Sequence, residues 1–340
     1  MEVARKLLSS ILPLALRKYL RDKSELVRRA LPGKPHGLPH LGLSATQIYP
    51  SGTNFDRVLL TAVHDKLRNV AITQNTRIAS IGTCFAEEFA FYMLAQHFNY
   101  VRTEPAALSA SANWGRVYTI PNLHQIVRYS IDRSFPLHAE KSAKGWFDPL
   151  REHDSAYSAT RDDALKAVEA HRQASRRAFA EAELLIITVG QNEAWVDQRS
   201  EMVWARLPPR EILEGVPPDT FSAREFGYAE NCALLTGLIN DLFALNPALR
   251  ILLTVSPVPS HATFCDTDVV SQSFANKCLL RSVVRDVIAG FPDRVFYFPS
   301  FEMVMCYNPR SFRADNRHVR HATVDRIFRL LEKTAVKRTP

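Results

Sequence analysis

Residues 77–98, RIASIGTCFAEEFAFYMLAQHF, decide the fold. The first six of them, 77–82, are small or apolar apart from Arg77 and predict a buried strand. From residue 85 onward the apolar side chains recur at helical spacing, with Phe85 and Phe89 on one face. Only two residues separate the two patterns, so the chain turns from strand to helix at once. Such a unit is typical of α/β proteins.

The same alternation of apolar runs and helical patterns recurs along the chain. Strands that are apolar on both faces and alternate with helices indicate a parallel sheet covered on both sides. We therefore expect an α/β class fold, a three-layer α/β/α sandwich with a mainly parallel central sheet. The expected strands cover 77–82, 99–102, 181–190, 250–256 and 294–298. The expected helices cover 85–98, 161–180, 229–245, 273–290 and 321–335.

Composition and charge exclude several classes of protein. The chain has 340 residues, of which 46% are hydrophobic and 23% charged, which is ordinary for a globular protein and unlike a disordered one. Residues 1–35 hold nine Lys/Arg against three Asp/Glu, and residues 317–340 hold seven against two. The formal charge of +8 therefore lies at the two ends and leaves −3 on the body. Since nucleic-acid binding needs clustered cations on the folded body, we expect no nucleic-acid partner.

The N-terminal segment is read as an extension, with residues 1–45 preceding a domain over 46–335. Apolar side chains share one helical face in residues 1–31, basic residues surround them, and a Pro/Gly-rich linker over 32–54 follows. Two interpretations stay open: a helix on a membrane surface, or a helix packed on the body or a partner. No apolar run reaches the roughly 18 residues that span a bilayer. We expect a cytoplasmic protein, with peripheral membrane contact as the alternative.

The five cysteines show neither a disulfide framework nor a zinc pattern, because their number is odd and no pair has CxxC spacing. No cluster with metal-ligand spacing is visible, and we expect no metal. Cys84 differs from the others because it follows a strand and begins a helix. A helix N-terminus lowers the pKa of a thiol and favours the thiolate, which predicts a nucleophile. The alternative is a packed structural thiol, since free cysteine is often buried.

Two further polar segments follow strands or precede the last helix, where ligands of parallel sheets bind. Asn192 follows the 181–190 strand, and its amide is placed to donate to an oxyanion or to cap a turn. Asp315 precedes His318 by three residues. At that spacing the carboxylate can bond the imidazole and fix its tautomer, as in a catalytic triad. The alternative is an ordinary polar surface loop.

The order of these segments resembles the SGNH (GDSL-type) hydrolase superfamily, and most closely its GSCFA branch. The resemblance covers about residues 50–330, and its motifs are specific because they occur in order. It implies an SGNH-like, flavodoxin-like α/β/α domain. The matching segments are GTCFA at 82–86, NWGRVYT at 113–119, ITVG at 187–190, TVSPVP at 254–259 and YFPSFE at 297–302.

The resemblance also implies roles for individual residues. Cys84 takes the place of the superfamily's nucleophilic serine, and His318 is the general base, oriented by Asp315. Gly115 supplies a backbone oxyanion donor and Asn192 a side-chain donor.

Five other residues are expected to support the site. Thr83 replaces the family's serine, as an assisting hydroxyl or as the nucleophile, and Glu193 follows the oxyanion asparagine. Trp114 and Trp195 either stack on a sugar ring or pack in the core. Arg317, with Arg320 beside it, is a candidate for holding an anionic substrate or a phosphate of coenzyme A.

A thiol nucleophile implies a thioester acyl-enzyme. Acyl-CoA is then a suitable donor, without a tightly bound cofactor. A glycan or similar hydroxylated molecule is the acceptor that the superfamily's esterases and O-acetyltransferases suggest, and water in its place gives an esterase. The alternative is a non-catalytic binding module of the same fold, for glycan at a membrane surface.

Overall fold

The structure is a computed structural model that describes residues 42–50, 54–67, 69–105, 110–152, 157–306 and 311–336. The chain divides into two compact units, Met1–Lys66 and Leu67–Pro340. The first unit contains the 3-10 helix η2 (Ala45–Gln47) and nearly all of helix α3 (Phe55–Leu67). The basic helix expected over 1–31 lies outside the described residues, so peripheral membrane contact stays a prediction. Within the described part of the chain, no helix is both long and apolar enough to cross a bilayer.

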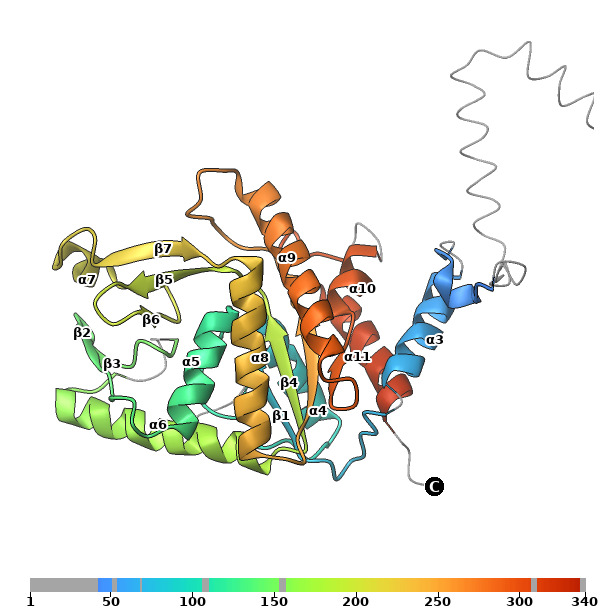
Figure 1. The fold of residues 1–340 in the computed structure, drawn as a ribbon, viewed down its shortest axis with the longest axis horizontal. Coiled ribbons are helices and arrows are strands. Elements are labelled where there is room, and N and C mark those ends of the chain that lie inside the picture. Colours follow the sequence, from blue (N-terminus) through green and yellow to red (C-terminus); the bar gives the residue numbers. More distant parts are fainter. Residues whose placement is uncertain are drawn as a thin grey trace, which may run out of the picture. The chain divides into compact units, whose positions relative to one another are not determined.

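A four-stranded parallel sheet forms the centre of the second unit (Figure 1). Its strands are buried over nearly their whole length, which explains the continuous apolar runs. In spatial order they are β1 (Ile78–Gly82), β4 (Leu184–Val189), β8 (Arg250–Val255) and β9 (Val295–Tyr297).

The strand expected over 99–102 is reduced to a single parallel bridge between Tyr100 and Ile78. The chain leaves the sheet after this bridge, because the backbone N–H of Thr103 bonds to the carbonyl of Ser111 instead. The bridge still places this segment on the outer side of β1. The strand order is thus that of a flavodoxin-like doubly wound sheet, with its switch point at β1.

Helices cover both faces of the sheet, which confirms the three-layer α/β/α class (Figure 1). One face packs Ile81, Ile187 and Leu253 against four helices. On the other face, the rings of Phe85 and Phe328 contact each other with centroids 5.7 Å apart. The four helices are α5 (Ile120–Ile131), α6 (Arg161–Glu181), α8 (Tyr228–Leu245) and α9 (Val269–Ala289), and the opposite face carries α4 (Cys84–Ala95) and α11 (His321–Ala335).

Several small elements were not predicted, because they are too short or too exposed to show a clear pattern. An antiparallel sheet in the order β6-β5-β7 follows β4 directly, and a β2–β3 hairpin precedes α6. Their bounds are β2 (Glu140–Ser142), β3 (Gly145–Phe147), β5 (Glu193–Asp197), β6 (Met202–Val203), α7 (Arg210–Glu214), β7 (Phe221–Glu225) and the late helix α10 (Ser300–Cys306).

Candidate active site

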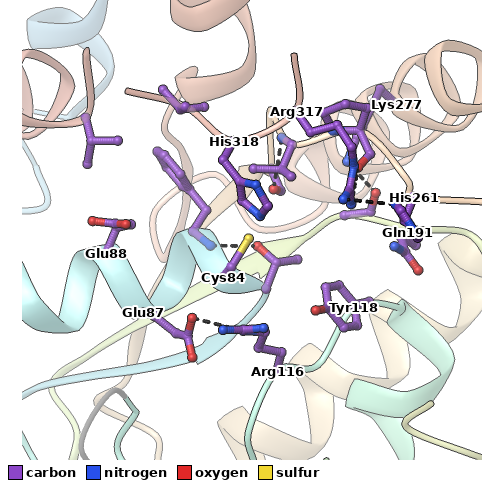
Figure 2. A pocket seen from close by; sticks show the side chains of 18 of the residues that line it. Cys84, Glu87, Glu88, Arg116, Tyr118, Gln191, His261, Lys277, Arg317 and His318 are labelled. Atoms are coloured by element: carbon purple, nitrogen blue, oxygen red, sulfur yellow. Dashed lines mark hydrogen bonds and ion pairs between the residues drawn. The ribbon is translucent and has the colours of Figure 1, made fainter. Parts of the chain in front are cut away.

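A cavity of about 450 Å³ opens at the carboxyl ends of the parallel strands. Cys84 follows β1, Gln191 follows β4 and Ser256 follows β8, and all three line it. Its position beside the switch point at β1 is where an open α/β sheet binds its ligand. Its volume lies within the range of small-molecule sites. The cavity is therefore the candidate active site (Figure 2).

Cys84 is held at the first position of α4 by the residue before it. Thr83 caps the helix, and its Oγ1 accepts a hydrogen bond from the backbone N–H of Phe85 at 3.2 Å. The same hydroxyl lies 2.9 Å from Oγ1 of Thr188 on the neighbouring strand. Thr83 is almost fully buried and engaged in these contacts. These contacts fit a hydroxyl that positions Cys84, and the alternative role of Thr83 as the nucleophile stays a prediction.

The pKa of the Cys84 thiol is raised by burial, which corrects the expectation of a thiolate stabilised at a helix N-terminus. Arg116 and Lys277 act in the opposite direction but do not outweigh the loss of solvent. Cys84 is thus a thiol at neutral pH, and attack on a carbonyl requires a base that removes its proton.

His318 lines the same cavity, and Figure 2 shows its imidazole directed toward the sulfur of Cys84. Its Nδ1 lies 2.5 Å from Oδ2 of Asp315, as the spacing predicts. The second carboxylate oxygen accepts the backbone N–H groups of Arg317 and His318, both at 3.0 Å. Asn316 completes the tight turn with φ of 54°, a left-handed conformation that asparagine tolerates.

These hydrogen bonds fix the charge of Asp315 and the orientation of the His318 ring. The hydrogen bond from His318 holds the pKa of Asp315 well below its ordinary value, so the carboxylate stays ionised. With Nδ1 committed to this carboxylate, Nε2 is the nitrogen left to face the cavity.

This geometry agrees with a family assignment from the sequence. The model of the GSCFA family matches residues 77–330, which include β1, the cavity and the Asp315–His318 turn. The chain belongs to the GSCFA family. A solved family 3 carbohydrate esterase from Clostridium thermocellum aligns with a TM-score of 0.35 and 12% identity, over 77% of this chain and 95% of that one. No curated protein sequence matches the chain significantly.

The two oxyanion donors implied by the GSCFA resemblance are not brought to the cavity, whose described lining consists of other residues. The Asn192 amide is fully buried and donates to Oε1 of Glu225 and to Oδ1 of Asn276, each at 3.3 Å. Gly115 has φ of +66°, and a side chain there would meet Glu152. Both residues therefore sit in the surrounding framework in this structure, and their oxyanion roles stay predictions.

The remaining expected residues separate into framework and cavity. Trp114 is fully buried and stacked on Phe179 with ring centroids 5.3 Å apart, so it packs in the core in this structure. Trp195 packs edge-on against Phe264 at 5.0 Å, outside the lining around Cys84. Glu193 accepts hydrogen bonds from the 263–264 loop and from Asn276. Arg317 does line the cavity.

Sequence reasoning missed several polar residues of the lining. Arg116 pairs with Glu87 at 3.0 Å, and Tyr118 follows two residues later in the same family motif. Lys277 is only 3% exposed, and its Nζ donates to the carbonyl of Gly190 at 2.5 Å. A signal was present, because Lys277 occupies the apolar face of α9 three residues before the buried Leu280. Within the described residues, no group of His, Cys, Asp and Glu could hold a metal ion.

The turn that presents Cys84 depends on Gly82, which gives a first prediction. Its φ of +139° disfavours other residues, and a Cβ there would lie 2.2 Å from the carbonyl oxygen of Thr188. Gly82→Ala is expected to lower the free energy of unfolding by about 2–4 kcal/mol, as measured by urea unfolding. The matched control is Gly227→Ala, where a Cβ meets nothing within 4 Å. Equal stability of both variants would contradict the prediction.

Proposed function

We propose that the protein cleaves or transfers acyl groups through a thioester on Cys84. The observation that carries this proposal is one cavity lined by both Cys84 and His318, with Nδ1 of His318 held by Asp315. A nucleophile, a base and a group that orients the base are the parts that covalent acyl transfer requires.

In the first half of the proposed reaction, Nε2 of His318 takes the thiol proton as the sulfur of Cys84 attacks the carbonyl carbon of the donor. The new C–S bond gives a tetrahedral oxyanion close to the positive end of α4. When the oxyanion collapses, the bond to the leaving group breaks. The leaving oxygen or sulfur takes the proton from the imidazolium, and the acyl group stays on Cys84 as a thioester.

In the second half, a hydroxyl attacks the thioester carbonyl and gives its proton to Nε2 of His318. The C–S bond breaks, and the thiolate of Cys84 recovers the proton. Water as the attacking molecule completes ester hydrolysis, and an alcohol completes O-acyl transfer. An acyl-CoA thioester suits the role of donor, because exchange between two thioesters is nearly balanced. The family resemblance favours a glycan or similar hydroxylated molecule as the acceptor and acetyl as the acyl group.

The thioester is the species that tests this proposal. Incubation with acetyl-CoA or p-nitrophenyl acetate is expected to add one acetyl group, seen by intact mass and removed by hydroxylamine. Cys84→Ala should lose the adduct. Cys232→Ala, which alters another half-buried cysteine, should retain it. An adduct that persists in Cys84→Ala overturns the assignment, and a lack of any adduct or turnover favours the non-catalytic binding module.

A further inference from the structure

The cavity carries cations that the proposed acyl chemistry does not use. Figure 2 shows Lys277 and Arg317 on one side of Cys84, and Glu87 and Glu88 on the other. Glu87 is neutralised by Arg116 on its own side. Lys277 and Arg317 therefore lie on a different wall of the cavity from the Glu87–Arg116 ion pair.

The side chain of Lys277 is more deeply buried than that of Arg317. Its side chain is almost entirely buried, and the structure gives its Nζ one hydrogen-bond acceptor, the carbonyl of Gly190. No described carboxylate lies within ion-pair distance of it. Because an ammonium group has three donors, a single neutral acceptor leaves the buried charge poorly compensated. The charge of Cys84 acts on Lys277 in the direction opposite to burial and raises its pKa.

Arg317 lies on the same wall, and its positive charge likewise pairs with no described carboxylate. One terminal nitrogen lies 3.2 Å from Nδ1 of His261, and the other donates to the carbonyl of Pro259 at 3.4 Å. Its Nε is buried without a partner in the described structure. These contacts orient the planar guanidinium without supplying a negative charge. A fixed guanidinium of this kind matches the geometry of a carboxylate or phosphate.

We propose that Lys277 and Arg317 form an anion-binding subsite beside Cys84, so that the substrate carries a carboxylate or phosphate close to its reactive acyl group. This inference rests on the proposed function only in taking Cys84 as the reacting centre. The subsite supplies the two cations, and the substrate supplies the negative charge, since no described carboxylate forms an ion pair with either of them.

Alkylation of Cys84 by a charged and a neutral reagent tests the subsite without knowledge of the substrate. The thiolate displaces iodide from either iodoacetate or iodoacetamide, and the ratio of the two rates at Cys84 is read by peptide mass spectrometry. The exposed Cys278 and Cys306 give the ordinary ratio within the same molecule. The experiment is run below pH 7, since burial lowers the pKa of Lys277 to about 7.

We expect the iodoacetate preference at Cys84 to exceed that at Cys278 by about tenfold, the lower end of what a charged cleft achieves. Lys277→Met and Arg317→Gln should each reduce it severalfold, whereas Arg317→Lys should retain most of it. Arg320→Gln is the matched control, because that arginine is on the same loop but outside the cavity lining. A lysine that merely activates the thiolate would change both rates equally and leave the ratio unaltered, which would overturn the proposal.

Protection experiments separate the two sources of the anion and keep this proposal distinct from the function proposed above. Slower iodoacetamide labelling in succinate supports a carboxylate, and slower labelling in inorganic phosphate supports a phosphate. If neither reagent labels Cys84, the buried thiol is unreactive under these conditions. The proposed function is then still judged by the acyl adduct, and the subsite by thermal stability alone. Stabilisation of the wild-type protein by either anion, lost in Lys277→Met and Arg317→Gln, then supports it, and no stabilisation overturns it.

Discussion

Replacement of His318 by alanine is expected to lower kcat/KM for acyl cleavage or transfer by about three orders of magnitude. The loss is large because burial raises the pKa of the Cys84 thiol and leaves no preformed thiolate to react without a base. The measurement is the steady-state rate with p-nitrophenyl acetate or with the acyl-CoA donor that labels Cys84.

The control for this prediction is His321→Ala. His321 begins α11 three residues after His318, but its Nε2 lies 3.0 Å from Arg313 and not beside Asp315. Its removal should change kcat/KM by less than about threefold. If the two alanine variants retain equal activity, His318 is not the base.

Asp315→Asn separates orientation from charge in the same turn. The amide can still bond the imidazole, but it no longer selects the tautomer whose Nε2 accepts the thiol proton. We expect a loss comparable to that of His318→Ala, with substrate KM little changed. Because the pKa of Asp315 lies far below its ordinary value, titration of this carboxylate should not contribute to the wild-type pH–rate profile near neutral pH.

The parts of the fold that the sequence predicts are those with a strong periodic signal. The buried strand β1, the helix that starts at Cys84 and the later strand–helix alternation follow from apolar runs that only a covered parallel sheet accommodates. The prediction of a strand over 99–102 was only partly correct, because this segment makes a single bridge with β1. The antiparallel strands after β4 were not predicted. In β7, for example, apolar and polar residues alternate little and most side chains are exposed.

Residue spacing alone predicted a site contact only between sequence neighbours, whereas the expectation that Cys84 and His318 share one site rested on the family resemblance. Asp315 and His318 belong to one turn, so their spacing implies their hydrogen bond. The side chain of Asn192 depends on Asn276 from a distant helix, and nothing local indicates that it points away from the cavity. The hydrogen bond from Lys277 to the carbonyl of Gly190 likewise joins distant segments, although the place of Lys277 on the apolar face of α9 was a local signal.

Lys277→Met is expected to change how stability depends on pH. The pKa of Lys277 falls from 10.5 to about 7 on burial, so the unfolded chain binds more protons than the folded one between these two values. The free energy of unfolding of the wild-type protein should therefore rise with pH through this window, by up to about 1.4 kcal/mol per pH unit. Below pH 7 both states are protonated, and the full cost of the buried charge is present.

The methionine variant lacks this titration, so its stability relative to the wild type should be greatest below pH 7 and fall by several kcal/mol toward pH 10. Losing the donor to the Gly190 carbonyl costs about 1–3 kcal/mol at every pH, which shifts the offset but leaves the slope unchanged. Urea unfolding at a series of pH values measures that slope. Lys166→Met, at an exposed lysine of α6, should show none, since that ammonium stays in solvent in both states. A pH-independent difference between wild type and Lys277→Met would mean that Lys277 keeps its ordinary pKa, and that its charge is already compensated inside the protein.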